Sequence, residues 1–118
     1  MATDPELKER INRLLEQTEL ATGQEPLSEA RRASWRYTLL APATVEFVDP
    51  VDSPKLLYVT TRTITAHSLD FRSPSVLERG QKLLITLDTD EGQLRIPATV
   101  VHSTESVGMP IVGVEFDL

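Results

Sequence analysis

The chain of 118 residues is 40% hydrophobic, contains no cysteine and carries a formal net charge of −6 at pH 7. Its length fits one globular domain with a short appendage, and the lack of cysteine excludes a disulfide framework and any thiolate nucleophile or metal ligand. The acidic balance argues against a protein that coats nucleic acid, and the sequence shows neither a signal-peptide run nor a membrane-spanning run, which predicts a cytoplasmic protein.

The first predicted element is an amphipathic helix over residues 4–22. Thr3 can cap it, with Glu6 three residues later, and Gly23 ends it. Apolar residues recur at helical spacing and form one stripe: Leu7, Ile11, Leu14 and Leu15. This stripe must be buried, either on the domain that follows or against a second copy of the chain. The second alternative would make a homodimer through the helix.

After a connection that contains Gly and Pro, apolar and polar residues alternate to the end of the chain, as is typical of strands. Clusters such as "DTDEG" and "SPSVLERG" are typical of turns between them. We expect strands at residues 43–47, 56–64, 69–73, 83–87, 94–100 and 112–118. Sequential antiparallel pairing is the simplest topology, and closure into a barrel would remove the exposed sheet edges.

The predicted fold class is therefore mainly β: a six-stranded antiparallel β-barrel preceded by an N-terminal amphipathic helix. The corresponding division of the chain is an N-terminal helix and linker at residues 1–30, followed by a barrel domain at residues 31–118. The length argues against a two-domain enzyme.

Three arginines precede the first strand. Arg31, Arg32 and Arg36 lie in "RRASWRY", around the only tryptophan, Trp35. A solvated helix end with a buried tryptophan would explain them without any function. The planar guanidinium group also suits phosphate oxygens, the O6 and N7 atoms of guanine, and stacking on a purine. The residues alone leave both interpretations open.

In the order of its motifs, the chain from residue 31 to 118 resembles the PilZ domain family. That family carries an RxxxR segment before the first strand of a six-stranded barrel, and here "RRASWRY" supplies it. Its second motif, [DN]xSxxG, is degenerate in "TITAHS", where Thr63, Thr65 and Ser68 take the three specified positions. A rival register places Ala66, Ser68 and Phe71 there.

PilZ domains are bacterial receptors for the second messenger cyclic di-GMP, so the resemblance implies a receptor or adaptor with this ligand and no cofactor. It implies that the ligand contacts the residues of both motifs: Arg31, Arg32, Arg36, Thr63, Thr65 and Ser68. The altered second motif predicts about 100-fold weaker binding than an intact site. The alternative is a degenerate PilZ-like module that binds a protein and not cyclic di-GMP.

No residue pattern typical of an enzyme accompanies these motifs. His67 and His102 are the only histidines, and neither belongs to a Ser-His-Asp order or a metal-binding spacing. We therefore expect no catalytic residue and no metal site. The expected partners are cyclic di-GMP and a protein of a signalling or motility pathway, with no nucleic acid polymer. Arg32→Ala and Arg36→Ala are each predicted to weaken ligand binding while leaving thermal stability nearly unchanged.

Overall fold

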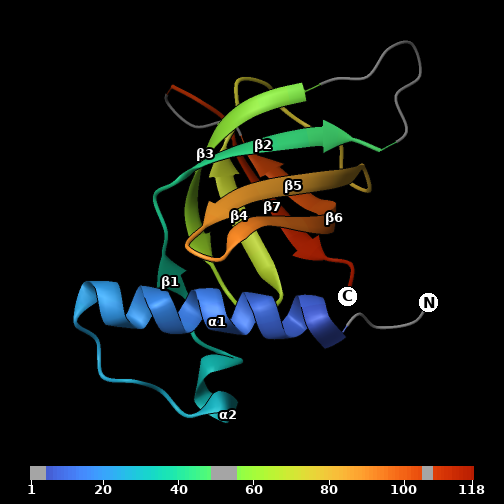
Figure 1. The fold of residues 1–118 in the computed structure, drawn as a ribbon. Helices are drawn as coiled ribbons and strands as arrows, with labels where there is room; N and C mark the ends of the chain where they lie inside the picture. Colours follow the sequence, from blue (N-terminus) through green and yellow to red (C-terminus); the bar gives the residue numbers. More distant parts are fainter. Residues whose placement is uncertain (1–4, 49–55, 105–107) are drawn as a thin grey trace.

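The structure, a computed structural model, describes residues 5–48, 56–104 and 108–118. Helix α1 (Pro5–Thr22) comes first, and a single turn, α2 (Glu29–Arg32), follows it. The strands are β1 (Tyr37–Thr38), β2 (Pro42–Phe47), β3 (Leu56–Ile64), β4 (Ser68–Arg72), β5 (Lys82–Thr89), β6 (Gly92–Thr104) and β7 (Ile111–Phe116) (Figure 1). The predicted cap Thr3 lies outside the described residues. Gly23 ends α1 with a φ of 74°, which an L side chain rarely adopts.

Six strands form a closed antiparallel barrel in the order β3–β2–β5–β6–β7–β4, and β4 pairs again with β3. The predicted fold class is thereby confirmed. The short strand β1 adds two residues to the end of β3, on the side opposite β4. The predicted sequential pairing is wrong for β4 and β5, since β4 pairs with β7 and β5 pairs with β2. The segment between β4 and β5 is too long for a tight hairpin and leaves β5 free to pair elsewhere.

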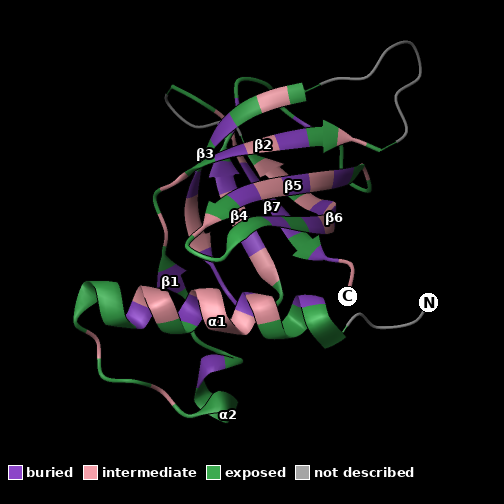
Figure 2. Cartoon of the chain, in the orientation of Figure 1, coloured by how far each residue is buried: buried purple, intermediate pink, exposed green. Residues whose placement is uncertain are grey.

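The hydrophobic core fills the barrel and extends to α1, which lies across one end of it (Figures 1 and 2). Inward-facing residues alternate along β5 and β6, as the sequence pattern predicted. Leu7, Ile11 and Leu15 are buried in the same cluster as the strand residues. The apolar stripe of α1 is therefore covered by the chain's own barrel. Neither helix in the described residues has the length and apolar character needed to cross a bilayer.

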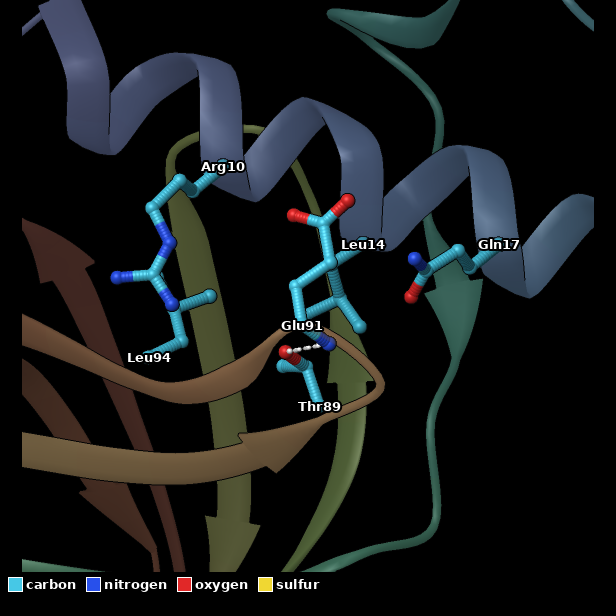
Figure 3. Close-up of a pocket in the computed structure, with 6 residues that line it drawn as sticks. All are labelled: Arg10, Leu14, Gln17, Thr89, Glu91 and Leu94. Atoms are coloured by element: carbon cyan, nitrogen blue, oxygen red, sulfur yellow. Dashed lines mark hydrogen bonds between the residues drawn. The ribbon is translucent and has the colours of Figure 1, made fainter.

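Polar contacts hold α1 against the hairpin between β5 and β6, and Figure 3 shows Arg10, Leu14 and Gln17 of α1 facing this hairpin. Arg10 Nη2 donates a hydrogen bond of 2.8 Å to the carbonyl oxygen of Gln93, and Arg13 Nε lies 3.0 Å from Glu91 Oε2. The Leu14 side chain helps to fill the space between helix and hairpin, which has no room for a water molecule. These contacts add to the buried apolar stripe in fixing the position of α1 relative to the barrel.

Candidate functional site

The arginine segment begins with the turn of α2. Ser28 caps this turn, because its hydroxyl oxygen accepts a hydrogen bond from the Arg31 amide at 3.3 Å. The chain then turns through Trp35 and enters β1 at Tyr37. This path separates the arginines: Arg32 is buried, whereas Arg31 and Arg36 are exposed.

Arg32 lies in an internal ion pair with α1. Its Nε donates to Glu19 Oε2 at 2.7 Å and its Nη2 donates to Glu19 Oε1 at 2.9 Å, a bidentate pair. Nη2 also donates to the carbonyl oxygen of Leu27 at 2.9 Å, while Nη1 lies 3.3 Å from Glu16 Oε1. Glu19 is almost fully buried. Arg32 therefore joins the arginine segment to the N-terminal helix and does not point to solvent.

Tyr37 completes this buried cluster. Its hydroxyl donates a hydrogen bond to Glu19 Oε2. The hydrogen bonds from Arg32, together with that from Tyr37, lower the pKa of Glu19 from 4.5 to about 2 in spite of its burial. Burial and the neighbouring Glu19 carboxylate raise the pKa of Tyr37 to about 12. The cluster of Glu19, Arg32 and Tyr37 therefore carries a fixed charge pair at neutral pH.

This charge pair predicts a loss of stability in acid. The folded-state pKa of Glu19 lies below its unfolded value, so its contribution is complete above pH 4.5 and is lost as the pH falls from 4.5 to 2. The contribution is about 3 kcal/mol, because each pKa step corresponds to about 1.4 kcal/mol. Urea unfolding from pH 7 to pH 2 should show it, and Glu19→Gln should flatten the curve below pH 4.5. An unchanged slope in that variant would contradict the assignment.

A hollow of about 210 Å³ lies on the barrel surface where β3, β4, β6 and β7 meet. Its polar lining comprises Arg36, Thr63, Ser68, Asp70, His102 and Glu115. Arg36 Nη1 donates to Thr63 Oγ1 at 3.1 Å, which links the arginine segment to the end of β3. The hollow thus brings together three of the six residues proposed from the motifs. Of the remaining three, Thr65 is buried beside Ser68, their hydroxyl oxygens being 2.7 Å apart, and Arg31 and Arg32 do not line the hollow.

The turn between β3 and β4 needs no glycine at residue 68. Among the described residues, only glycines have a positive φ, so Ser68 does not adopt the conformation that would favour glycine. The Thr65 amide donates to the carbonyl oxygen of Ser68 at 2.9 Å and closes the turn. A side chain at position 68 therefore causes no backbone strain, and this part of the altered motif does not weaken the site. In the rival register Phe71 would take the glycine position, yet its side chain is fully buried in the core.

Three polar residues of the lining were missed by the sequence reasoning: Asp70, His102 and Glu115. Asp70 lies directly opposite Thr63 in the pairing of β3 with β4, and its carboxylate bonds to Thr63. The His102 ring lies against Gly113, where a Cβ atom would clash with the imidazole. A glycine in the alternating "VGVEF" strand was the available signal for a close approach. The signal for Asp70 was a charged residue between Leu69 and Phe71 of a short strand.

Trp35 lies at the surface beside Arg31. Its side chain is 40% exposed, and the Arg31 guanidinium carbon is 6.0 Å from the centre of the indole ring. This separation is at the limit of a cation–π contact. The tryptophan is therefore only partly covered, and both groups remain accessible to a planar ligand.

Comparisons with known proteins point to one family. Residues 30–118 match the family model of the PilZ domain. Among solved structures, the chain is similar to the PilZ domain with c-di-GMP of YcgR from Escherichia coli, with a TM-score of 0.53 and 12% sequence identity. The match covers 74% of this chain and 78% of that chain, and at this identity it shows a common fold. No curated protein sequence matches. The described residues hold no group of three or more His, Asp or Glu side chains arranged to bind a metal ion.

Proposed function

Because the chain belongs to the PilZ domain family, we propose that it binds cyclic di-GMP and acts as a receptor or adaptor in bacterial signalling. One observation carries the proposal: the exposed Arg36 meets Thr63 and Ser68 at a single hollow on the barrel. The similar fold of a PilZ domain solved with this dinucleotide supports it. We further propose that the protein acts in the cytoplasm and is not an enzyme.

Arg36 is the proposed phosphate ligand. Its side chain is 67% exposed, its hydrogen bond to Thr63 lies at the surface and its contact with Asp70 is long, at 4.0 Å, so little is lost when the guanidinium turns towards a phosphate. The hydroxyl groups of Thr63, Thr65 and Ser68 can bond to the ligand or position one another. Arg31 and Trp35 offer a guanidinium and an indole plane on which a guanine can stack.

Arg32 can join the ligand only after it leaves Glu19. Breaking a buried ion pair costs about 3–5 kcal/mol. A new charged hydrogen bond from Arg32 to the ligand would return only about 1.5–3 kcal/mol. We therefore propose that Arg31 and Arg36 hold the dinucleotide first. The direct contribution of Arg32 remains a proposal that depends on the opening of the Glu19 pair.

Titration with cyclic di-GMP tests the proposed function. We expect Arg36→Ala to weaken binding about ten- to a hundredfold, because a charged hydrogen bond to phosphate is lost. Thermal stability should be nearly unchanged, since Arg36 is exposed. Arg95→Ala is the matched control, because Arg95 is an exposed arginine on β6 that does not line the hollow. Absence of binding heat for the natural protein in calorimetry would refute the receptor function.

The alternative is a PilZ-like module that binds a protein partner instead. Exposed apolar side chains on and beside β2 and β3 favour it: Leu40, Leu56 and Tyr58. Such side chains can contribute to a protein interface. A partner from a signalling or motility pathway remains a proposal under either function. Binding of that partner by a protein that gives no heat with cyclic di-GMP would support the alternative.

The division into residues 1–30 and 31–118 and the homodimer through α1 also remain proposals. The apolar stripe of α1 is already buried on the barrel, so a dimer would have to use the opposite face of α1. Leu20, an exposed leucine of that helix, is the apolar residue available there. Mass determination of the natural protein in solution distinguishes a monomer from such a dimer.

A further inference from the structure

We propose that Asp70 is the residue that selects guanine in the hollow, by accepting a hydrogen bond from the N1–H or N2–H group of the base. This inference deepens the proposed function and rests on it. It concerns a residue outside both motifs, on the strand that follows the second one.

One oxygen of the carboxylate holds Asp70 in place. Oδ1 accepts a hydrogen bond from the Thr63 amide at 2.8 Å and another from Thr63 Oγ1 at 2.7 Å. The side chain is only 15% exposed, and its backbone pairs with that of Thr63 across β3 and β4. Two short hydrogen bonds and partial burial fix the orientation of the group, which is the condition for selecting one ligand geometry.

The other oxygen has capacity to accept from a ligand. Oδ2 lies 3.6 Å from Arg62 Nη1 and 4.0 Å from Arg36 Nη1. Both distances exceed that of a hydrogen bond, so these are ion pairs that balance the carboxylate charge without filling its lone pairs. Oδ2 belongs to a residue that lines the hollow. A donor that entered the hollow could therefore bond to it.

Guanine supplies the matching donors. Its edge presents the N1–H and N2–H groups beside the O6 acceptor, whereas adenine presents an unprotonated N1 at the same edge. A carboxylate can accept from both N1–H and N2–H of guanine, whereas at adenine it meets the lone pair of N1 and only the N6 amino group can donate to it. Arg36, whose Nη1 lies 4.0 Å from Oδ2, is near enough to donate to O6 or to a phosphate of the same ligand. A site that hydrogen-bonds a base in this way discriminates strongly against an analogue lacking the group.

Asp70 fits this role better than the second carboxylate of the lining. The Glu115 side chain is exposed on β7, while that of Asp70 is fixed by Thr63. The placement of Asp70 also matters for position 63, where the second motif has Asp or Asn and this chain has threonine. The carboxylate of Asp70 lies against the Thr63 hydroxyl and so offers an acceptor one strand away. It reduces the loss of affinity that the altered second motif predicts.

The test is calorimetric titration with cyclic di-GMP and with cyclic di-AMP, a dinucleotide with the same phosphates and different bases. Asp70→Asn keeps the shape and the oxygen that Thr63 needs, and replaces the free oxygen by an amide donor. We expect it to weaken cyclic di-GMP binding about ten- to a hundredfold and to leave cyclic di-AMP binding equal or stronger. Asp88→Asn on β5 is the matched control and should change neither affinity, and Glu115→Gln should keep the preference.

A swap tests position separately from charge. Thr63→Asp combined with Asp70→Thr moves the carboxylate across the strand pair. This double variant should recover the preference for cyclic di-GMP that Asp70→Asn loses. It keeps a carboxylate in the hollow, so it remains informative if Asp70→Ala does not fold. Equal strengthening of both dinucleotides by Asp70→Asn would show that the carboxylate only screens Arg36, and would overturn the inference while the receptor function stands. The same holds if Asp70→Asn keeps the natural preference or Glu115→Gln abolishes it. Absence of binding to either dinucleotide would overturn both.

Discussion

Arg32→Ala is expected to lower the free energy of unfolding by about 3–5 kcal/mol, because it leaves the buried Glu19 carboxylate without its cation. The substitution removes two short hydrogen bonds to Glu19 and one to the carbonyl oxygen of Leu27. The Tyr37 hydroxyl and the Leu27 amide, which donates to Glu19 Oε1 at 3.3 Å, would remain to donate to that carboxylate. Urea unfolding at pH 7, followed by circular dichroism, measures the change.

Arg31→Ala is the control for this prediction. Arg31 precedes Arg32 in the same turn of α2 and is exposed, so its replacement should change the free energy of unfolding by less than about 0.5 kcal/mol. Equal stability of the two variants would contradict the structural role of Arg32. The expected result reverses what the sequence predicted, namely an unchanged stability for Arg32→Ala. Ligand binding by the Arg32→Ala variant must therefore be measured under conditions in which this variant remains folded.

The reason for this reversal is visible in the helix pattern. Glu19 follows Leu15 by four residues and so lies on the buried face of α1. A glutamate at the end of an apolar stripe was the one available signal that a cation would approach there. The sequence could not show which of the three arginines supplies it, because the answer depends on how the linker folds back along α1 (Figure 1).

The strands were predicted closely because alternation sets both the residues that face inward and the limits of each segment. Residues 56–64 were expected as a strand and form β3 with those bounds. Pairing was harder to predict. The partners of β4 and β5 depend on closure of the whole barrel, and no local turn chemistry in the intervening segment encodes that.

The candidate site was predicted in part for the same reasons. A motif read along the chain grouped Thr63, Thr65 and Ser68, which are local neighbours. Asp70 entered the site through strand register, since it pairs with Thr63 across β3 and β4. Its alternation with Leu69 and Phe71 predicted an outward-facing residue and gave no sign of its partner. Contacts set by register become visible only when the pairing is known.

Ile11→Lys combined with Leu15→Lys is expected to abolish cooperative folding. Both side chains are fully buried between α1 and the barrel, with exposed fractions of 1% and 0%. Two ammonium groups would replace them without any partner, at a cost of about 5 kcal/mol or more, which is comparable with the whole stability of a small domain. Loss of the cooperative urea transition and of the native circular dichroism spectrum would show it.

Leu20→Lys is the matched control, because it makes the same replacement on an exposed turn of the same helix and should leave the transition nearly unchanged. The pair of variants also separates the two interpretations of the apolar stripe. A stripe that served a homodimer would give a folded monomer with half the mass when Ile11 and Leu15 are replaced. Light scattering that showed this folded monomer would contradict the packing of α1 on its own barrel. An unfolded variant would instead show that the barrel needs α1, the helix whose Glu19 holds Arg32.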